Sequence, residues 1–372
     1  MNLKKLLLIL QNQFTSIGGQ AVIEGVMMRS PNAFVVAVRT PEGKIKLRKD
    51  QWFGFSKKFE FLKFPFFRGV LILIETMANG IVSLNYSANI AMAEEKREEL
   101  RKKGKSEEEI EKLEEGEQKV TWQTFLTIGG SLIFGMGLFV ALPHLLTALL
   151  ENSVGAKWGL QSIQFHLIDG AIKATIFLLY IFLIGLLPDV KRVFQYHGAE
   201  HKSISTFESG KDLKVDNAVL FTTFHPRCGT TFIFFLIFIS IILFAGIFVF
   251  IPMPTNIHPI AKHFIAVGYK ILLSFPVAGI SYELIKWSGK NVNSVFGKII
   301  SVPGMMLQRL TTREPDESQL EVALASIKTV LLLEEKFELN KANKKILSVE
   351  EIEIENLADI ESSSLVLKDF LE

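Results

Sequence analysis

Two histidines four residues apart, with a glutamate between them, are the side chains of this sequence best suited to chemistry. They lie in YHGAEHKSISTFESG, residues 196–210. On a helix, His197 and His201 project from the same face one turn apart, so two imidazoles could hold one metal ion. His-x-x-Glu-His is the order of the inverted zincin motif, in which Glu200 would polarise a metal-bound water. The spacing predicts a divalent metal site, most readily zinc, with Glu200 as general base.

A second polar motif, FHPRCGTTF at residues 224–232, supplies further ligand types. His225 or Cys228 would be the third zinc ligand, and Glu208 is a further polar candidate at the end of the first motif. Arg227 could stabilise an anion that develops during hydrolysis. Cys228 also precedes an expected helix N-terminus and neighbours an arginine, an environment that lowers the pKa of a thiol.

An alternative interpretation needs no metal. His197 and His201 would then form hydrogen bonds within a helix at the membrane surface, and Pro226 and Gly229 would only turn the chain. The other histidines are expected to be inert, and His144 lies inside an apolar stretch. The remaining three lie on the opposite side of the expected membrane domain: His166, His258 and His263.

The composition indicates a membrane protein with segregated charged regions. Of the 372 residues, 49% are hydrophobic and 22% are charged, and the mean hydropathy is +0.30. A net charge of +2 gives no sign of a nucleic-acid-binding protein, and no nucleic-acid partner is expected. The single cysteine, Cys228, excludes an internal disulfide framework and fits a reducing compartment.

About four transmembrane helices are expected, because about 20 apolar residues span a bilayer core of about 30 Å. The four apolar stretches are 125–150, 171–187, 231–251 and 264–285. The connections 152–170 and 252–263 hold one basic residue each, whereas 188–230 holds six. Basic loops stay in the cytoplasm. Both termini and the His-Glu-His segment are therefore predicted to face the cytoplasm, within a membrane domain at 123–312.

The N-terminal third is predicted to hold smaller units. Residues 1–16 would form an interfacial helix, and 17–60 a small β-rich unit in which AFVVAVRT and KIKLRK are strands joined by PEGK. The preceding GGQAVIEGVMMRSP is expected to be a loop and strand edge. Alternatively, its Glu24 and Arg29 could reach the site.

Residues 61–93 are apolar but interrupted by Arg68, Glu75, Asn79 and Tyr86, which share one helical stripe. Because charges rarely face lipid, this segment is predicted to be an interfacial or re-entrant helix. Arg68 and Glu75 are further polar site candidates, and a purely structural polar seam is the alternative.

Two charged regions complete the chain. Residues 94–122 are expected to be a solvated helical linker with i, i+4 ion pairs. Residues 313–372 would be a cytoplasmic helix, opened by a capping box at Ser318 and Glu321, and an acidic tail from about 345 that is peripheral or mobile.

Four motifs in order resemble the YqhQ-like family of bacterial membrane proteins, which carries the label "predicted metal-dependent enzyme". They are GGQAVIEGVMMRSP, YHGAEHKSISTFESG, HPRCGTTF and PGMMLQRLTTREPDESQLEVALAS, between about residues 17 and 327. The resemblance implies a location in the bacterial cytoplasmic (inner) membrane, and it implies no substrate. The polar positions of the family fall here on Glu24, Arg29, His197, Glu200, His201, Glu208, His225, Arg227 and Cys228.

Two functions from different classes follow. The first is a zinc-dependent hydrolase whose site faces the cytoplasm, with Arg227 or Arg29 beside a substrate that is a peptide or a lipid-linked molecule. The second is a membrane scaffold or assembly factor in which the His/Cys cluster is structural. In that case the cytoplasmic N- and C-terminal regions would bind protein partners.

Overall fold

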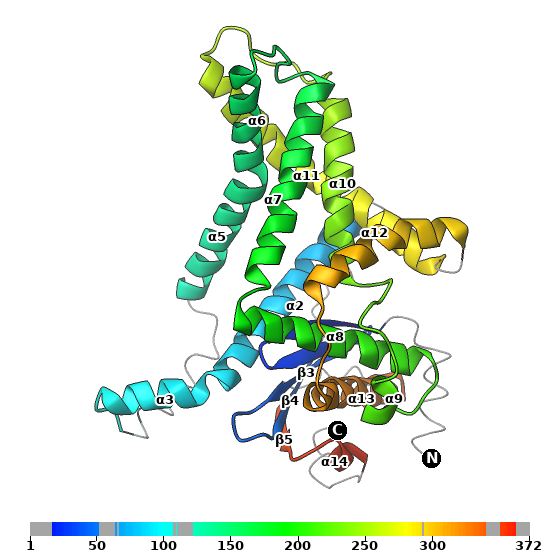
Figure 1. Ribbon diagram of the computed structural model, residues 1–372. Helices are drawn as coiled ribbons and strands as arrows, with labels where there is room; N and C mark the ends of the chain where they lie inside the picture. The colour runs from blue at the N-terminus through cyan, green and yellow to red at the C-terminus, as the bar shows by residue number, and fades with distance from the viewer. Residues whose placement is uncertain are drawn as a thin grey trace.

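The chain is mainly helical and has two parts, a long helical bundle and a small α/β unit at one end of it (Figure 1). The computed structural model describes residues 17–51, 64, 67–106, 109, 122–291, 294–339 and 350–361. The predicted N-terminal helix at 1–16 and most of the linker at 107–121 lie outside the described residues.

The α/β unit is built on one antiparallel sheet of five strands in the order β1-β2-β3-β4-β5. The strands are β1 (Gly18–Val22), β2 (Gly25–Arg29), β3 (Ala33–Arg39), β4 (Ile45–Gln51) and β5 (Glu350–Ile354). The predicted hairpin of β3 and β4 is confirmed, with the Thr40 N–H bonded to the Lys44 carbonyl at 2.8 Å. The preceding motif, expected to be a loop and strand edge, is itself a hairpin of β1 and β2.

The strand β3 is buried on both faces, which fixes the sheet between two helices. Its side chains at 33, 35 and 37 pack against α13 (Glu317–Leu339), and Phe34, Val36 and Val38 form a second cluster with Tyr86 of α2 (Phe67–Ala91). A continuous run of apolar residues is typical of such a doubly covered strand.

The C-terminal region belongs to this core. The predicted helix is confirmed as α13, but its capping box is formed by Asp316 and Gln319, which exchange hydrogen bonds of 2.8 and 3.0 Å. The acidic tail was predicted to be peripheral, and this is wrong for 350–354, which form β5. Glutamates of β5 pair with lysines of β4, as Glu351 does with Lys46 at 3.0 Å, and Ile352 and Ile354 are buried.

The bundle contains the four predicted apolar stretches as helices. The first stretch consists of α5 (Trp122–Met136), a π turn at Gly137–Ala141 and α6 (Leu142–Ser153), which follow one another without a break. The other three are α7 (Ile163–Ile184), α10 (Gly229–Ile247) and α11 (Pro259–Lys290). The π turn ends two residues before Pro143, whose missing N–H disturbs the regular helical ladder. Five helices of the described residues are long and apolar enough to cross a membrane, because α2 also qualifies.

The helix α2 is the segment predicted to be interfacial or re-entrant, and it runs obliquely from the bundle to the sheet (Figure 1). Its polar stripe faces protein: Glu75, Asn79 and Tyr86 are buried, and Arg68 forms an ion pair with Glu283 of α11. A short charged helix, α3 (Ala93–Lys102), follows and has the expected i, i+4 ion pairs.

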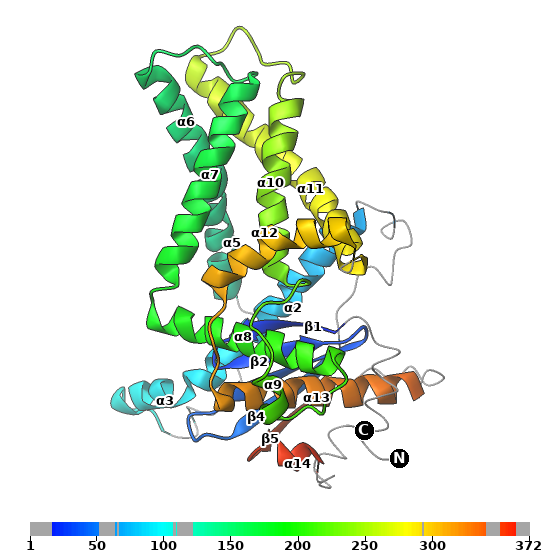
Figure 2. The same cartoon turned by 45° about the vertical axis from the view of Figure 1, so that its right-hand side comes forward.

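Two helices run across the bundle axis where the bundle meets the α/β unit (Figure 2). They are α8 (Pro188–Glu208) and α12 (Val295–Thr311). The short α9 (Val215–Ala218) and α14 (Ala358–Glu361) complete the described fold. The crossing of α8 beneath the bundle brings the His-Glu-His motif between the two parts of the molecule.

Candidate metal centre

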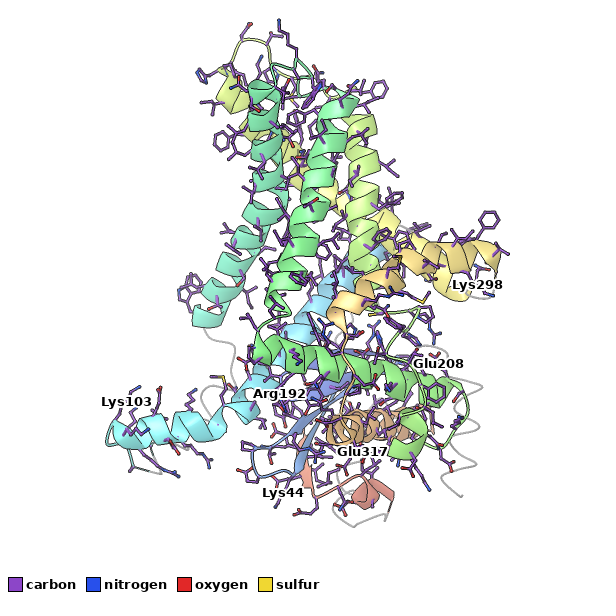
Figure 3. All side chains as sticks on the ribbon, viewed as in Figure 1. Lys44, Lys103, Arg192, Glu208, Lys298 and Glu317 are labelled. Atoms are coloured by element: carbon purple, nitrogen blue, oxygen red, sulfur yellow. The ribbon has the colours of Figure 1, made fainter. Side chains whose placement is uncertain are left out.

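The helix α8 carries the His-Glu-His motif between the sheet and the bundle, and Figure 3 shows Arg192 and Glu208 toward its two ends. Most of its second half is buried. A Cβ atom on Gly198 would lie 2.1 Å from the Arg313 carbonyl oxygen. The glycine within HGAEH therefore lets α8 approach the chain between α12 and α13.

Three of the predicted ligands converge. One ligand atom each from His197, His201 and Cys228 lie within 4.8 Å of one another, and His197 Nε2 is 3.1 Å from Cys228 Sγ. The two histidine rings have centroids 4.5 Å apart. His201 and Cys228 are buried, and His197 is half-buried. The three residues, here named the His₂Cys cluster, come from α8 and from the N-terminus of α10.

Hydrogen bonds at Nδ1 orient both imidazoles of the cluster. His197 Nδ1 is 2.8 Å from the Thr311 carbonyl oxygen, and His201 Nδ1 is 2.6 Å from that of Thr223. A carbonyl can only accept, so each Nδ1 carries the proton and each Nε2 offers its lone pair, that of His197 toward Cys228 Sγ. His201 Nε2 is buried with no hydrogen-bond partner. Backbone carbonyls fix metal-binding histidines in this way.

The cluster fits the ligand preference of zinc. Two imidazole nitrogens and one thiolate are soft or borderline ligands, and three protein ligands are the set found in catalytic zinc sites. Burial lowers the pKa of His201 well below its ordinary value, so its imidazole is neutral and able to bind a metal. The buried Nε2 of His201, which has no hydrogen-bond partner, is free to bind a metal ion.

Cys228 differs from the sequence expectation. It is the N-cap of α10, and its Sγ accepts a hydrogen bond from the Thr230 N–H at 3.4 Å. Burial raises the pKa of this thiol, although the thiol was expected to have a lowered pKa. Desolvation raises the thiol pKa more than the hydrogen bonds at the helix N-terminus lower it. A coordinated metal would favour the thiolate and so lower this pKa.

Glu200 is buried beside the cluster. Burial raises the pKa of its carboxyl to about 8, and His197, together with a backbone hydrogen bond from Gly19, opposes the rise. A Cβ atom on Gly19 would lie 2.8 Å from Glu200 Cγ and Oε1. Strand β1 thus needs a glycine where it meets the carboxyl. Gly19 is a site residue that sequence reasoning missed, although its motif was noted.

His225 lies next to the cluster but outside it. Its ring centroid is 5.7 Å from that of His201, and its Nε2 is 3.3 Å from Glu208 Oε2. The buried amide of Gln308 holds the His225 backbone through two hydrogen bonds of 2.8 and 2.9 Å. Arg227 also forms an ion pair with Glu208. These residues surround the cluster without adding to its ligand atoms.

The other polar candidates lie elsewhere. Glu24 forms an ion pair with Arg192 whose two N–O distances are 2.5 Å. Burial lowers the pKa of Arg29, which interacts electrostatically with Glu75. Arg68 and Glu75 of α2 face α11 and the sheet rather than the cluster. A cleft of about 500 Å³ includes Glu24 and Arg192 in its lining and none of the cluster residues.

Comparison with known proteins places the chain in a family. Residues 64–333 match the family described as "Protein of unknown function (DUF1385)". The chain is 34% identical over 330 residues to "Uncharacterized protein YqhQ" of Bacillus subtilis (strain 168), an alignment that covers 87% of this chain and 95% of that protein. No solved structure matches the chain. Because both matches extend over most of its length, the chain belongs to the DUF1385 family of YqhQ-like proteins.

Proposed function

We propose that this protein is a multi-pass bacterial inner-membrane protein with a zinc-dependent hydrolase site on the cytoplasmic side of the bilayer. The observation that carries the proposal is the orientation of the cluster imidazoles. Both bind a backbone carbonyl through Nδ1, which leaves Nε2 of His201 free and that of His197 near Cys228. A buried imidazole nitrogen that keeps its lone pair and lies beside a thiol is available to a metal ion.

The proposed roles follow from the geometry. His197, His201 and Cys228 would hold the metal, and zinc would supply a Lewis acid that polarises a water or a substrate oxygen. Glu200 would accept and hold a proton beside it, since a nearby dication favours the carboxylate over the neutral acid. Arg227 is exposed and precedes Cys228 in the chain, and it would attract an anionic group.

A substrate at the membrane surface is supported by α12. Its large apolar side chains at 295, 296, 299, 302 and 306 are exposed and share one helical face. Because α12 runs across the bundle axis, its exposed apolar face fits a helix that lies in the plane of a membrane interface. The same helix supplies the Thr311 carbonyl that orients His197. The site would therefore sit just below the headgroups, within reach of an amphiphilic ester or peptide.

A structural His/Cys site in a membrane scaffold is the second candidate, and burial favours it. His201 is 1% exposed and Cys228 8%. A closed fourth position would make the site structural, and an open one catalytic. In the scaffold the cytoplasmic N- and C-terminal regions would bind protein partners.

Metal removal tests the hydrolase. Purified protein would be loaded with zinc without oxygen and assayed against amphiphilic esters, peptides and phosphodiesters. Hydrolysis should disappear when a chelator strips the metal and return when zinc is restored. A panel in which no substrate is cleaved in a zinc-dependent manner, despite bound zinc, would favour the scaffold instead.

The proposed topology places α8 and the sheet in the cytoplasm and the loops after α6 and α10 on the outer side. Single cysteines at Ser209 and Ser153, both exposed, should react with an impermeant thiol reagent from opposite sides of the membrane. The same sidedness at both positions would contradict the topology. A tag after Ala93 decides whether α2 also crosses, because the proposal expects this tag in the cytoplasm.

A further inference from the structure

The end of the bundle farthest from the sheet holds a second cluster of ionisable side chains, and only its histidines were expected to be inert. Five of its members are buried to 6% exposure or less: His144 of α6, His166, Asp169 and Lys173 of α7, and Lys270 of α11. Ionisable groups among membrane-spanning helices are costly and mark functional sites. The cluster is separate from the His₂Cys cluster, which lies at the opposite end of the bundle.

Four of the ionisable groups form a continuous chain of contacts. Lys270 Nζ is 2.6 Å from Asp169 Oδ1 and 3.1 Å from His144 Nδ1. His144 Nε2 is in turn 3.0 Å from His263 Nδ1. His263 is half-buried near the outer end of α11, where Glu151 is close enough to act on it electrostatically. The chain therefore leads from a buried ion pair to the distal face of the molecule.

Hydrogen-bond chemistry fixes the direction of this chain. An ammonium group can only donate, so His144 Nδ1 accepts from Lys270 and the His144 proton is on Nε2. That N–H then donates to His263 Nδ1, and His263 carries its own proton on Nε2. Every donor thus points away from Lys270 toward the distal face, which is the arrangement of a proton relay.

The charges around Lys270 do not balance. Lys173, one turn from Asp169 on α7, is a second ammonium group; it is 3.3 Å from Ser240 Oγ and 4.8 Å from the centroid of the Phe244 ring. His166 binds the Leu160 carbonyl at 2.9 Å. Two ammonium groups therefore share one carboxylate in surroundings that penalise surplus charge. Loss of one proton would leave the cluster neutral.

We propose that Lys270 is a proton-binding site inside the membrane and exchanges its proton with the distal face through His144 and His263. The proposal rests on the membrane placement of the bundle and is independent of the metal. In the release step Lys270 Nζ gives a proton to His144 Nδ1, His144 gives its Nε2 proton to His263 Nδ1, and His263 gives its Nε2 proton to water. Lys270 becomes an amine, and one proton has left.

Proton release after a pH jump tests this relay. The protein in lipid nanodiscs would be taken from about pH 6 to about pH 9, where exposed lysines stay charged, and a pH-sensitive dye would count the protons. Wild type should release about one proton more than Lys270→Met. Lys157→Met, an exposed control on the same distal face, should match wild type.

Two further variants separate the relay from a structural ion pair. Lys173→Met removes the surplus charge and should also abolish the extra proton, which keeps the test valid if Lys270→Met does not fold. His263→Ala should slow the release at least about tenfold. Equal proton counts in wild type and both lysine variants would overturn the proton site. An unchanged rate in His263→Ala would overturn the relay.

Discussion

Replacement of His201 by alanine is expected to lower the zinc affinity of the protein at least about 100-fold. The free energy of zinc binding at structural sites is about 10 kcal/mol or more. Divided among three ligands, this is about 3 kcal/mol for each, or roughly a 100-fold change in the dissociation constant. His201 has the one cluster nitrogen that is buried and unpartnered. Competition with a chromophoric chelator, on folded protein checked by circular dichroism, measures the affinity.

Neighbouring histidines provide matched controls for this experiment. His225→Ala should change zinc affinity only slightly, because its Nε2 contacts Glu208 rather than the cluster. Replacement of His258, which is exposed at the distal end, should leave the zinc affinity unchanged. His197→Ala should lower the affinity as His201→Ala does. A larger loss in His225→Ala than in His201→Ala would show that the ligand set has been assigned wrongly.

Glu200→Gln is expected to lower the zinc-dependent hydrolytic rate by roughly 10²–10⁴-fold, the usual contribution of a general base. Zinc affinity should change less than about tenfold, because the glutamine amide keeps the size of the side chain and can still accept from Gly19. Steady-state kinetics on a substrate from the panel, with metal analysis of the same sample, separates the two effects.

Glu208→Gln is the control for Glu200, since Glu208 is exposed and contacts Arg227 and His225 instead of the cluster. It should keep most of the activity. Full activity in Glu200→Gln would remove Glu200 from the mechanism, and loss of zinc in that variant would make it a ligand rather than a base.

Local spacing explains what the sequence could predict about the site. His197 and His201 share a helical face because they are four residues apart, and this holds wherever the helix lies. The choice between His225 and Cys228 depended on tertiary contacts. Gln308 of α12 holds His225 outside the cluster, and nothing in the spacing of the two motifs indicates that helix.

The same distinction applies to the fold. The β3–β4 hairpin and the apolar helices were predictable from local pattern, but β5 was not. Its acidic sequence is typical of a solvated tail, and only the tertiary fold brings it beside the basic strand β4. His144 and His263 were expected to be inert because the sequence could not show that Lys270 and Asp169, from two other places in the chain, meet at His144.

X-ray absorption spectroscopy at the zinc edge, on wild-type protein loaded without oxygen and freed of excess metal, tests the central claim most directly. The His₂Cys cluster predicts one zinc per chain with one sulfur at about 2.3 Å and nitrogen ligands at about 2.0 Å. The sulfur should disappear in Cys228→Ser. A shell of oxygen ligands alone, or a protein that retains no zinc under any loading condition, would contradict the metal centre and the hydrolase proposed from it.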